Sequence, residues 1–295
     1  MHASGHFATA ALVAAAALPL CAQAAPSPAA GSTAQPVRDL VHDVVYNELH
    51  DRERDSHWEY RSECVSPSQR LVREQVETDQ GPVFRLLEQN GTPLNDTENE
   101  QEDARLNRYV HDPAHVAQIL HAHEEDEARM ASVLKILPDA FLFEYQGQPS
   151  GDIARIAFRP NPLFVPSGYE ARVVHALAGT ITVDTRLRRL IEIRGTVIER
   201  VDFGYGFLGH VEKGGTFTIH RRQVSAEHWK TDLVEVHVQG KVLLLKTIGK
   251  DQREARTDFR RVPDGTTVAE ARDMLNLAAR ETVQARMVPL TEGSK

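Results

Sequence analysis

The sequence predicts an α+β protein dominated by an antiparallel meander that forms one large sheet or an open barrel. Between residues 141 and 262, short β-branched and aromatic runs are broken by Gly, Asp or Lys about every eight to twelve residues. An amphipathic helical pattern precedes the strands, and a charged helical segment interrupts them at residues 92–137. These three observations indicate a sheet with helices packed against it.

The first 24 residues are typical of a signal peptide. Residues 7–20 form an apolar, Ala-rich core, and Ala22-Gln23-Ala24 offers a cleavage site. The apolar run is about 14 residues long, shorter than the roughly 20 that a membrane-spanning helix needs. The alternative is a bacterial lipoprotein acylated at Cys21, which Leu20 disfavours because that position should be small. We therefore expect export to the periplasm, with no transmembrane segment after cleavage.

Charge and cysteine content argue against nucleic-acid binding and against an intramolecular disulfide. The formal net charge is −8, and the basic residues are scattered, so the chain lacks the electrostatic pattern of nucleic-acid binding. Cleavage after Ala24 would remove Cys21 and leave Cys64 as the only thiol, which excludes an intramolecular disulfide. Cys64 lies in a predicted strand, and we expect an unreactive thiol there.

The early elements follow from local pattern. Residues 25–36, rich in Ala, Ser, Gly and Pro, predict a flexible tether, and an apolar spacing of three and four residues then predicts a helix over 37–54. Strands are expected at 58–64, 70–77 and 82–88, with turns at Gly81 and at Asn90-Gly91.

The later elements are punctuated by Pro and by capping residues. Asp112-Pro113 predicts a helix start, and residues 92–137 read as a helix pair on the open face of the sheet rather than a separate domain, because the segment is too polar to form its own core. The Pro-rich residues 160–166 predict an extended strap before a short helix at 169–177. Thr267 and Glu270 form a capping box that starts a C-terminal helix within residues 263–295.

One motif resembles a cofactor site but lacks its context. Gly204, Gly206 and Gly209 match the dinucleotide fingerprint G-x-G-x-x-G. That motif requires a helix immediately after the glycines, and here strand and turn residues follow instead. We interpret it as a bend between strands and predict no cofactor.

Catalytic and metal sites have only weak support. His111, His115, His121 and His123 crowd one segment, and His121 could share a helix face with Glu125. No H-E-x-x-H motif, Cys cluster, G-x-S-x-G or S-x-x-K accompanies them. Asp184 and Asp202 are expected at strand ends in turn roles. We therefore predict neither a catalytic residue nor a metal ligand, and keep a metal-dependent hydrolase on 111–125 as the weakest hypothesis.

Several stretches carry a resemblance to a known group of proteins. They are Phe158-Arg159-Pro160-Asn161-Pro162, Leu177-Ala178-Gly179 with Val183-Asp184, Phe203-Gly204-Tyr205-Gly206-Phe207-Leu208-Gly209, and Lys213-Gly214-Gly215-Thr216-Phe217. The chain resembles the periplasmic lipoprotein-carrier fold of LolA, LolB and the RseB N-terminal domain, and exported bacterial proteins described as outer-membrane lipoprotein-sorting proteins. The resemblance spans roughly residues 37–262. It implies a curved antiparallel sheet, an unclosed β-barrel whose concave face is covered by helices.

The leading hypothesis is a periplasmic binding or carrier protein for a lipid, an acyl chain or a lipoprotein. A curved sheet with one apolar face must cover that face with helices or with a ligand. Strand alternation predicts six residues that would line the cavity: Phe141, Phe143, Ile156, Phe158, Phe217 and Ile219. The same residues could equally be ordinary core beneath the helices. The alternative function is a non-catalytic envelope sensor or adaptor that binds another protein.

Overall fold

The computed structural model describes residues 36–51, 57–203, 209–242 and 251–287. From Gln35 onward the chain belongs to one compact unit. The predicted signal peptide (1–24), and all but the last residue of the predicted tether (25–36), lie outside the described residues.

Five helices and fourteen strands are described. The helices are α1 (Val37–Asp51), α2 (Asp96–Val110), α3 (Pro113–Ala140), α4 (Tyr169–His175) and α5 (Val268–Met287). The strands are β1 (Trp58–Ser66), β2 (Gln69–Val76), β3 (Val83–Gln89), β4 (Thr92–Pro93), β5 (Phe141–Tyr145), β6 (Ile153–Pro160), β7 (Leu177–Asp184), β8 (Arg189–Val197), β9 (Val201–Phe203), β10 (Gly209–Val211), β11 (Thr216–Gln223), β12 (Trp229–His237), β13 (Gly240–Val242) and β14 (Asp251–Arg261).

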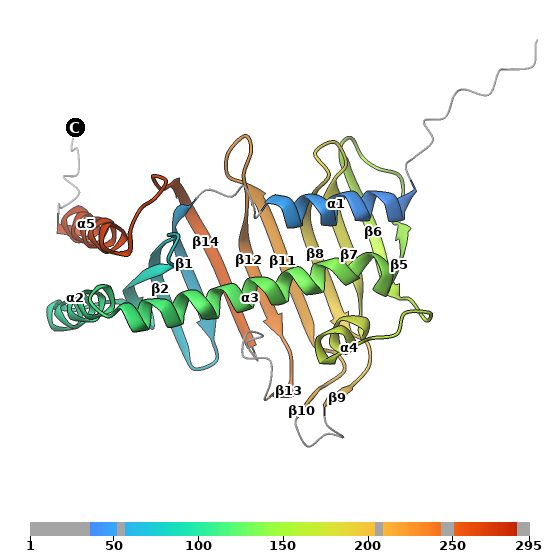
Figure 1. Ribbon diagram of the computed structural model, residues 1–295, viewed down its shortest axis with the longest axis horizontal. Helices are drawn as coiled ribbons and strands as arrows, with labels where there is room; N and C mark the ends of the chain where they lie inside the picture. Colours follow the sequence, from blue (N-terminus) through green and yellow to red (C-terminus); the bar gives the residue numbers. More distant parts are fainter. Residues whose placement is uncertain (1–35, 52–56, 204–208, 243–250, 288–295) are drawn as a thin grey trace, which may run out of the picture. The chain divides into compact units, whose positions relative to one another are not determined.

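Eleven strands form one curved sheet that does not close into a barrel (Figure 1). Their order is β4-β3-β2-β1-β14-β12-β11-β8-β7-β6-β5, and the neighbouring pairs are antiparallel. The α+β class and the large antiparallel sheet are confirmed. The central strand β14 joins the early strands to the late ones; the sequence analysis did not identify it, because its composition is mostly charged and polar.

The glycine motif connects two antiparallel strands. β9 ends at Phe203, β10 begins at Gly209, and the two pair with each other. Together with β13 they form a separate three-stranded sheet, which the single predicted meander did not anticipate. Residues 204–208 lie outside the described residues. The element after the motif is a strand, so the helix N-terminus that a dinucleotide site requires is not found there.

Two helices lie on the concave, inner face of the sheet. α1 packs on β5 and β8, and the C-terminal half of α3 packs beside it over β5. In Figure 1, α3 crosses in front of the sheet from the β2 end to the β5 end. Residues 92–137, predicted as a helix pair, contain α2 and most of α3, of which α3 crosses the open face.

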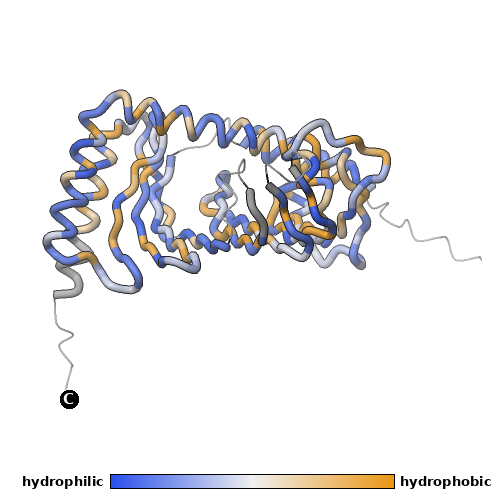
Figure 2. The backbone as a smooth tube through the Cα atoms, turned by 90° about the horizontal axis from the view of Figure 1, so that it is seen from below, coloured by the Kyte–Doolittle hydropathy of each residue, from blue (hydrophilic) through white to orange (hydrophobic). Residues whose placement is uncertain are grey.

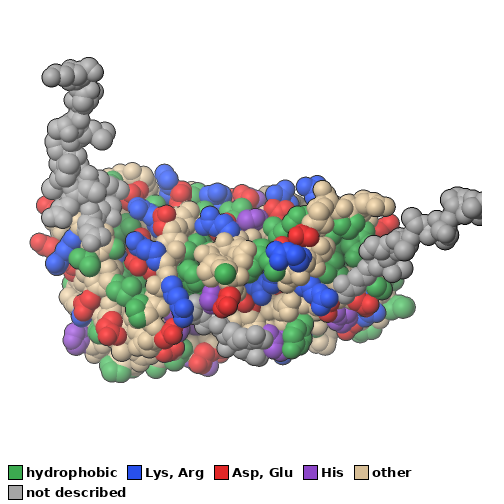
Figure 3. All heavy atoms as spheres, turned by 90° about the horizontal axis from the view of Figure 1, so that it is seen from above, with side chains coloured by type: hydrophobic (Ala, Val, Ile, Leu, Met, Phe, Trp, Pro, Cys, Tyr) green, Lys and Arg blue, Asp and Glu red, His purple; other side chains and the backbone are tan. Residues whose placement is uncertain are grey.

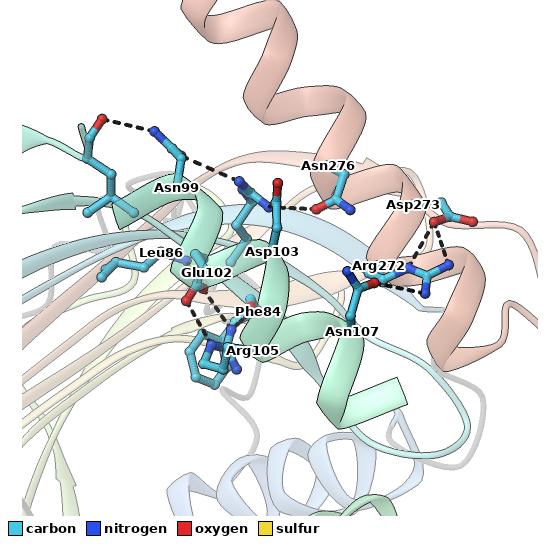
Figure 4. Close-up of polar contacts among 12 residues, drawn as sticks. Phe84, Leu86, Asn99, Glu102, Asp103, Arg105, Asn107, Arg272, Asp273 and Asn276 are labelled. Carbon is cyan, nitrogen blue, oxygen red and sulfur yellow. Dashed lines mark hydrogen bonds and ion pairs between the residues drawn. The ribbon is translucent and has the colours of Figure 1, made fainter. Parts of the chain in front are cut away.

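The β2–β3 end of the sheet carries helices on its opposite, outer face. Val76 and Val83 point away from the inner face and are buried against Leu106 of α2 and Leu275 of α5. A polar layer accompanies this packing (Figure 4): Arg85, 4% exposed, donates to Asp103 and to the Oδ1 of Asn276. These contacts fix the end of the sheet from which α3 departs.

Hydrogen bonds at the N-terminus and in the middle of α2 hold this helix on the sheet ahead of α3. Asn95 and Glu98 form a capping box at the N-terminus of α2, and the buried Glu102 accepts from the backbone N–H of Leu86 at 2.8 Å. Asp112 then caps α3, with Pro113 at its first turn as predicted. Near this start, Leu120 lies beside Gly81 in the β2–β3 turn.

Candidate functional site: the inner face beneath α3

The inner face can be followed across nine strands by directly opposed residues. In an antiparallel sheet, opposed side chains share a face. One row, from β5 to β2, contains Tyr145, Ile156, Ile181, Ile193, Ile219, Val234, Glu254, Cys64 and Leu71. The row is apolar from Ile156 to Val234 and becomes polar at Glu254.

A second row runs parallel to the first. It contains Phe143, Phe158, Gly179, Gly195, Phe217, Val236 and Gln252. A Cβ on Gly195 would overlap the ring of Phe217, so the missing side chain makes room for that ring. This row also changes from apolar to polar between β12 and β14, where Val236 opposes Gln252.

The β5–β8 end of the inner face is a filled core. Phe141, Ile156 and Phe158 are buried there, together with Leu40 and Val44 of α1. Phe143 is half-buried, and the rings of Phe141 and Phe158 meet edge to face with centroids 4.9 Å apart. Three of the six candidate cavity residues are therefore buried in this core, and Phe143 and Phe217 are partly buried residues packed against it. Residues of α1 and of the C-terminal half of α3 cover this part of the sheet.

A different environment surrounds the middle of α3. All residues from 121 to 128 are exposed, a stretch of about two helical turns that includes every side of the helix. His123 and Glu127 continue the helical line of Val116 and Leu134, which pack in the two core clusters at the ends of α3, yet their side chains are 48% and 50% exposed. The middle of α3 therefore does not rest on the sheet.

The middle of α3 and the partly exposed side chains of β11 and β12 beneath it therefore both remain accessible to water. We define the bridged space as the region between residues 121–128 and the inner face of β8, β11, β12, β14, β1 and β2. In Figure 2, which traces the backbone alone, α3 runs apart from the strands of the sheet in this region. Its apolar floor contains Phe217, Ile219, Val234 and Val236, which are only half-buried, in contrast to Ile156 at 0% exposed.

The other half of the floor is polar. Tyr60, Arg73 and Arg256 project from β1, β2 and β14 on the inner face. The side-chain amide of Gln75 donates to the Tyr60 hydroxyl at 2.6 Å, and Arg256 Nε donates to Glu254 at 2.7 Å. Burial raises the pKa of Tyr60 above its ordinary value, although nearby Arg256 acts to lower it, so the phenol is neutral at physiological pH.

A buried ion-pair cluster ties α1 to the sheet at the edge of the apolar floor. Glu48 and Asp51 of α1 pair with Arg189 of β8 and Arg221 of β11. Arg221 also donates to the backbone carbonyl of Trp229 at 2.6 Å. Burial lowers the pKa of Arg221 to about 10, so its guanidinium remains charged at neutral pH.

The histidine-rich segment does not assemble a metal centre. His111 caps the end of α2, while His121 Nε2 lies 3.5 Å from Glu125 Oε1 on the exposed surface of α3. Within the described ranges, no three side chains of His, Cys, Asp or Glu gather as metal ligands would. Asp184 accepts from the backbone N–H of Leu187, a turn role as predicted, and Asp202 of β9 pairs with Arg200.

The thiol of Cys64 lies half-buried on the inner face of β1. Burial is the main cause that raises the pKa of the Cys64 thiol above its ordinary value, and the nearby Glu254 carboxylate raises it further, although Arg73 opposes the shift. A raised pKa favours the unreactive protonated thiol at neutral pH.

Two pockets lie towards the ends of α3. One of about 410 Å³ lies between α3 and α4 and is lined by Val133, Ile136 and Ala171 among others. The other, about 320 Å³, lies where α3 meets the start of α5 and includes Val116 and Val268. None of the six candidate cavity residues lines either pocket.

Sequence reasoning identified part of this site. Phe217 and Ile219 lie on the floor of the bridged space, whereas Val234 and Val236 were recognised only as strand residues. Arg73, Glu254 and Arg256 were missed. In β14 the inner-face residues Gln252, Glu254 and Arg256 alternate with Arg253, Ala255 and Thr257, so the pattern gives no apolar signal that would mark a face.

In comparisons with known proteins, no protein-family model and no curated protein matches the chain.

Among the described residues, no helix has the length and apolar character needed to cross a membrane. On the face shown in Figure 3, acidic and basic side chains are interspersed, without a continuous basic surface.

Proposed function

We propose that the mature protein is a periplasmic binding or carrier protein that holds an acyl chain in the bridged space. The ligand would be a lipid, a fatty acid or the acyl group of a lipoprotein. The observation that carries this proposal is the exposed middle of α3 above half-buried apolar side chains. Such side chains are stabilised when a ligand removes their remaining surface from water, by about 25 cal/mol per Å².

The sequence supports the same function from independent features. The N-terminal residues are typical of an export signal, and the strand-and-turn motifs resemble those of periplasmic lipoprotein carriers. A binding site that combines a curved sheet with a covering helix is a common arrangement for apolar ligands. The filled core under α1 keeps the scaffold rigid while the neighbouring strands remain available.

Native mass spectrometry of protein purified from the periplasm of its own host tests this proposal. We expect a fraction of the protein to carry one lipid or fatty acid, and the delipidated protein to take up one molecule of added oleate. Ile219→Glu should abolish uptake without unfolding the protein, whereas Arg155→Glu on the outer face should not change it. A protein that is empty and takes up no fatty acid or lipid would refute the proposal.

A second function, an adaptor for another envelope protein, has its own supporting observation. The strap after β6 exposes Leu163 (87%) and Val165 (83%). The strap is held in place by Asn161, whose side chain donates to the carbonyl of Asp139 at 2.9 Å and accepts from the N–H of Leu163 at 3.1 Å. Fixed, exposed apolar residues of this kind occur at protein interfaces.

Cross-linking in cells distinguishes this adaptor function from the carrier function. A stoichiometric partner that is lost in a Leu163→Ser, Val165→Ser variant, and retained in Ile219→Glu, would support an adaptor. If the double variant cross-links to the same proteins as the wild type, the strap has no such role.

A further inference from the structure

The floor of the bridged space changes from apolar to polar along one line. Val234 opposes Glu254 and Val236 opposes Gln252, so both rows change at the boundary between β12 and β14. From β12 to β8 the floor is apolar, over a width of roughly 10 Å at the usual strand spacing. A ligand in this space would therefore meet two chemically distinct surfaces.

Two arginines flank a serine on the polar side. Ser62 of β1 is opposed by Arg73 of β2 and by Arg256 of β14. Adjacent strands lie about 4.8 Å apart, so the Cα atoms of the two arginines are roughly 10 Å apart. Both side chains project from the inner face on either side of the small, buried serine.

The two arginines differ in their partners. Arg256 donates to Glu254 at 2.7 Å and lies over the Tyr60 ring, 5.2 Å from its centroid. Arg73 lies over the Phe84 ring at 4.8 Å, but no acidic side chain in the described ranges forms an ion pair with it, and its buried Nε has no hydrogen-bond partner. The polar half of the floor therefore presents one uncompensated positive charge.

We propose that the ligand is an anionic amphiphile, whose apolar chain lies on β8, β11 and β12 and whose acidic head group binds at Arg73. This inference rests on the proposed function and specifies its substrate class. A guanidinium binds carboxylate and phosphate groups through paired, charge-assisted hydrogen bonds. Arg256 and Ser62 provide further donors beside Arg73, while the apolar half offers the chain no polar partner.

The head-group preference can be measured with two probes that share a chain. Oleate and oleyl alcohol differ only in the oxidised head carbon, so the ratio of their dissociation constants isolates the contribution of the anion. We expect oleate to bind at least tenfold more tightly than oleyl alcohol, because a hydrogen bond to a charged group contributes about that factor. Arg73→Gln should reduce the ratio to near one, mainly by weakening oleate.

Four controls separate the possible outcomes. Arg73→Lys should keep part of the preference, and Arg155→Gln on the outer face should keep all of it. Inorganic phosphate should not displace oleate at similar concentrations, because it lacks the chain. Dodecyl phosphate should displace it.

Equal binding of the acid and the alcohol by the wild type would overturn the head-group assignment and leave the carrier function standing. Failure of both probes to bind would overturn the carrier function as well. A preference that survives Arg73→Gln, in a variant with unchanged thermal stability, would show that the anion binds elsewhere.

Discussion

The contrast between a filled and an open end of the inner face predicts very different costs for two similar substitutions. Ile156 and Val234 lie in the same cross-sheet row with three strands between them, Ile156 in the core and Val234 in the bridged space. Ile156 is 0% exposed and surrounded by core residues, so Ile156→Ala should cost about 2–5 kcal/mol of unfolding free energy. Val234 is half-buried, and Val234→Ala should cost about 1 kcal/mol or less.

Urea unfolding of both variants checks this difference. A change of midpoint at constant slope reports stability alone, so the two free energies can be compared directly. Leu233→Ala, on the outer face of the same strand, controls for changes to β12 that do not involve the bridged space. If Val234→Ala destabilised the protein as much as Ile156→Ala, α3 would have to pack on the floor, and the reasoning would be wrong.

Three further predictions concern the scaffold around the site. Arg221→Met removes one of the two arginines that pair with the buried Glu48 and should cost about 3–5 kcal/mol, visible as a lower thermal midpoint; a neutral effect would mean that the cluster does not hold α1. Gly195→Ala forces the Phe217 ring to move and should lower stability, with partial rescue by Phe217→Leu; unchanged stability would argue against the close approach. Burial alone would raise the pKa of Glu102, but its hydrogen bonds from Arg105 and from the Leu86 N–H, with the charge of Arg105, lower it overall. Its stabilising contribution is therefore present above the unfolded-state pKa and lost as the pH falls through the lowered one, so Glu102→Gln should flatten the acid limb of a stability–pH curve, and an identical limb would contradict this.

The fold was largely predictable because its elements have local causes. The hairpin at Asn90-Gly91, where both residues have positive φ, the Pro113 helix start and the Thr267–Glu270 capping box all depend on neighbouring residues. The position of β14 was not predictable. This strand is placed by pairing with β1 and β12, which are far away in sequence, and its residues carry no apolar alternation of their own.

The candidate site was predictable only in part, for a related reason. Alternation correctly grouped Ile156 with Phe158 and Phe217 with Ile219 on one face, but it does not tell which pair α1 covers. The interruption of the α3 apolar stripe at His123 and Glu127 is a usable signal, because polar residues on the line of packed side chains indicate a stretch that faces water. Recognising that signal requires knowing that α3 spans the sheet.

Cysteine accessibility tests most directly the central claim that α3 bridges an open space which can hold an acyl chain. In a chain with Cys21 and Cys64 replaced by Ser, a single thiol is introduced by Val234→Cys or by Ile156→Cys, and its reaction with a small maleimide is timed under native conditions. We predict rapid labelling of the Val234→Cys variant, slowed many-fold by oleate, and very slow labelling of the Ile156→Cys variant with or without oleate. Equal protection of both thiols in the absence of ligand would contradict the claim.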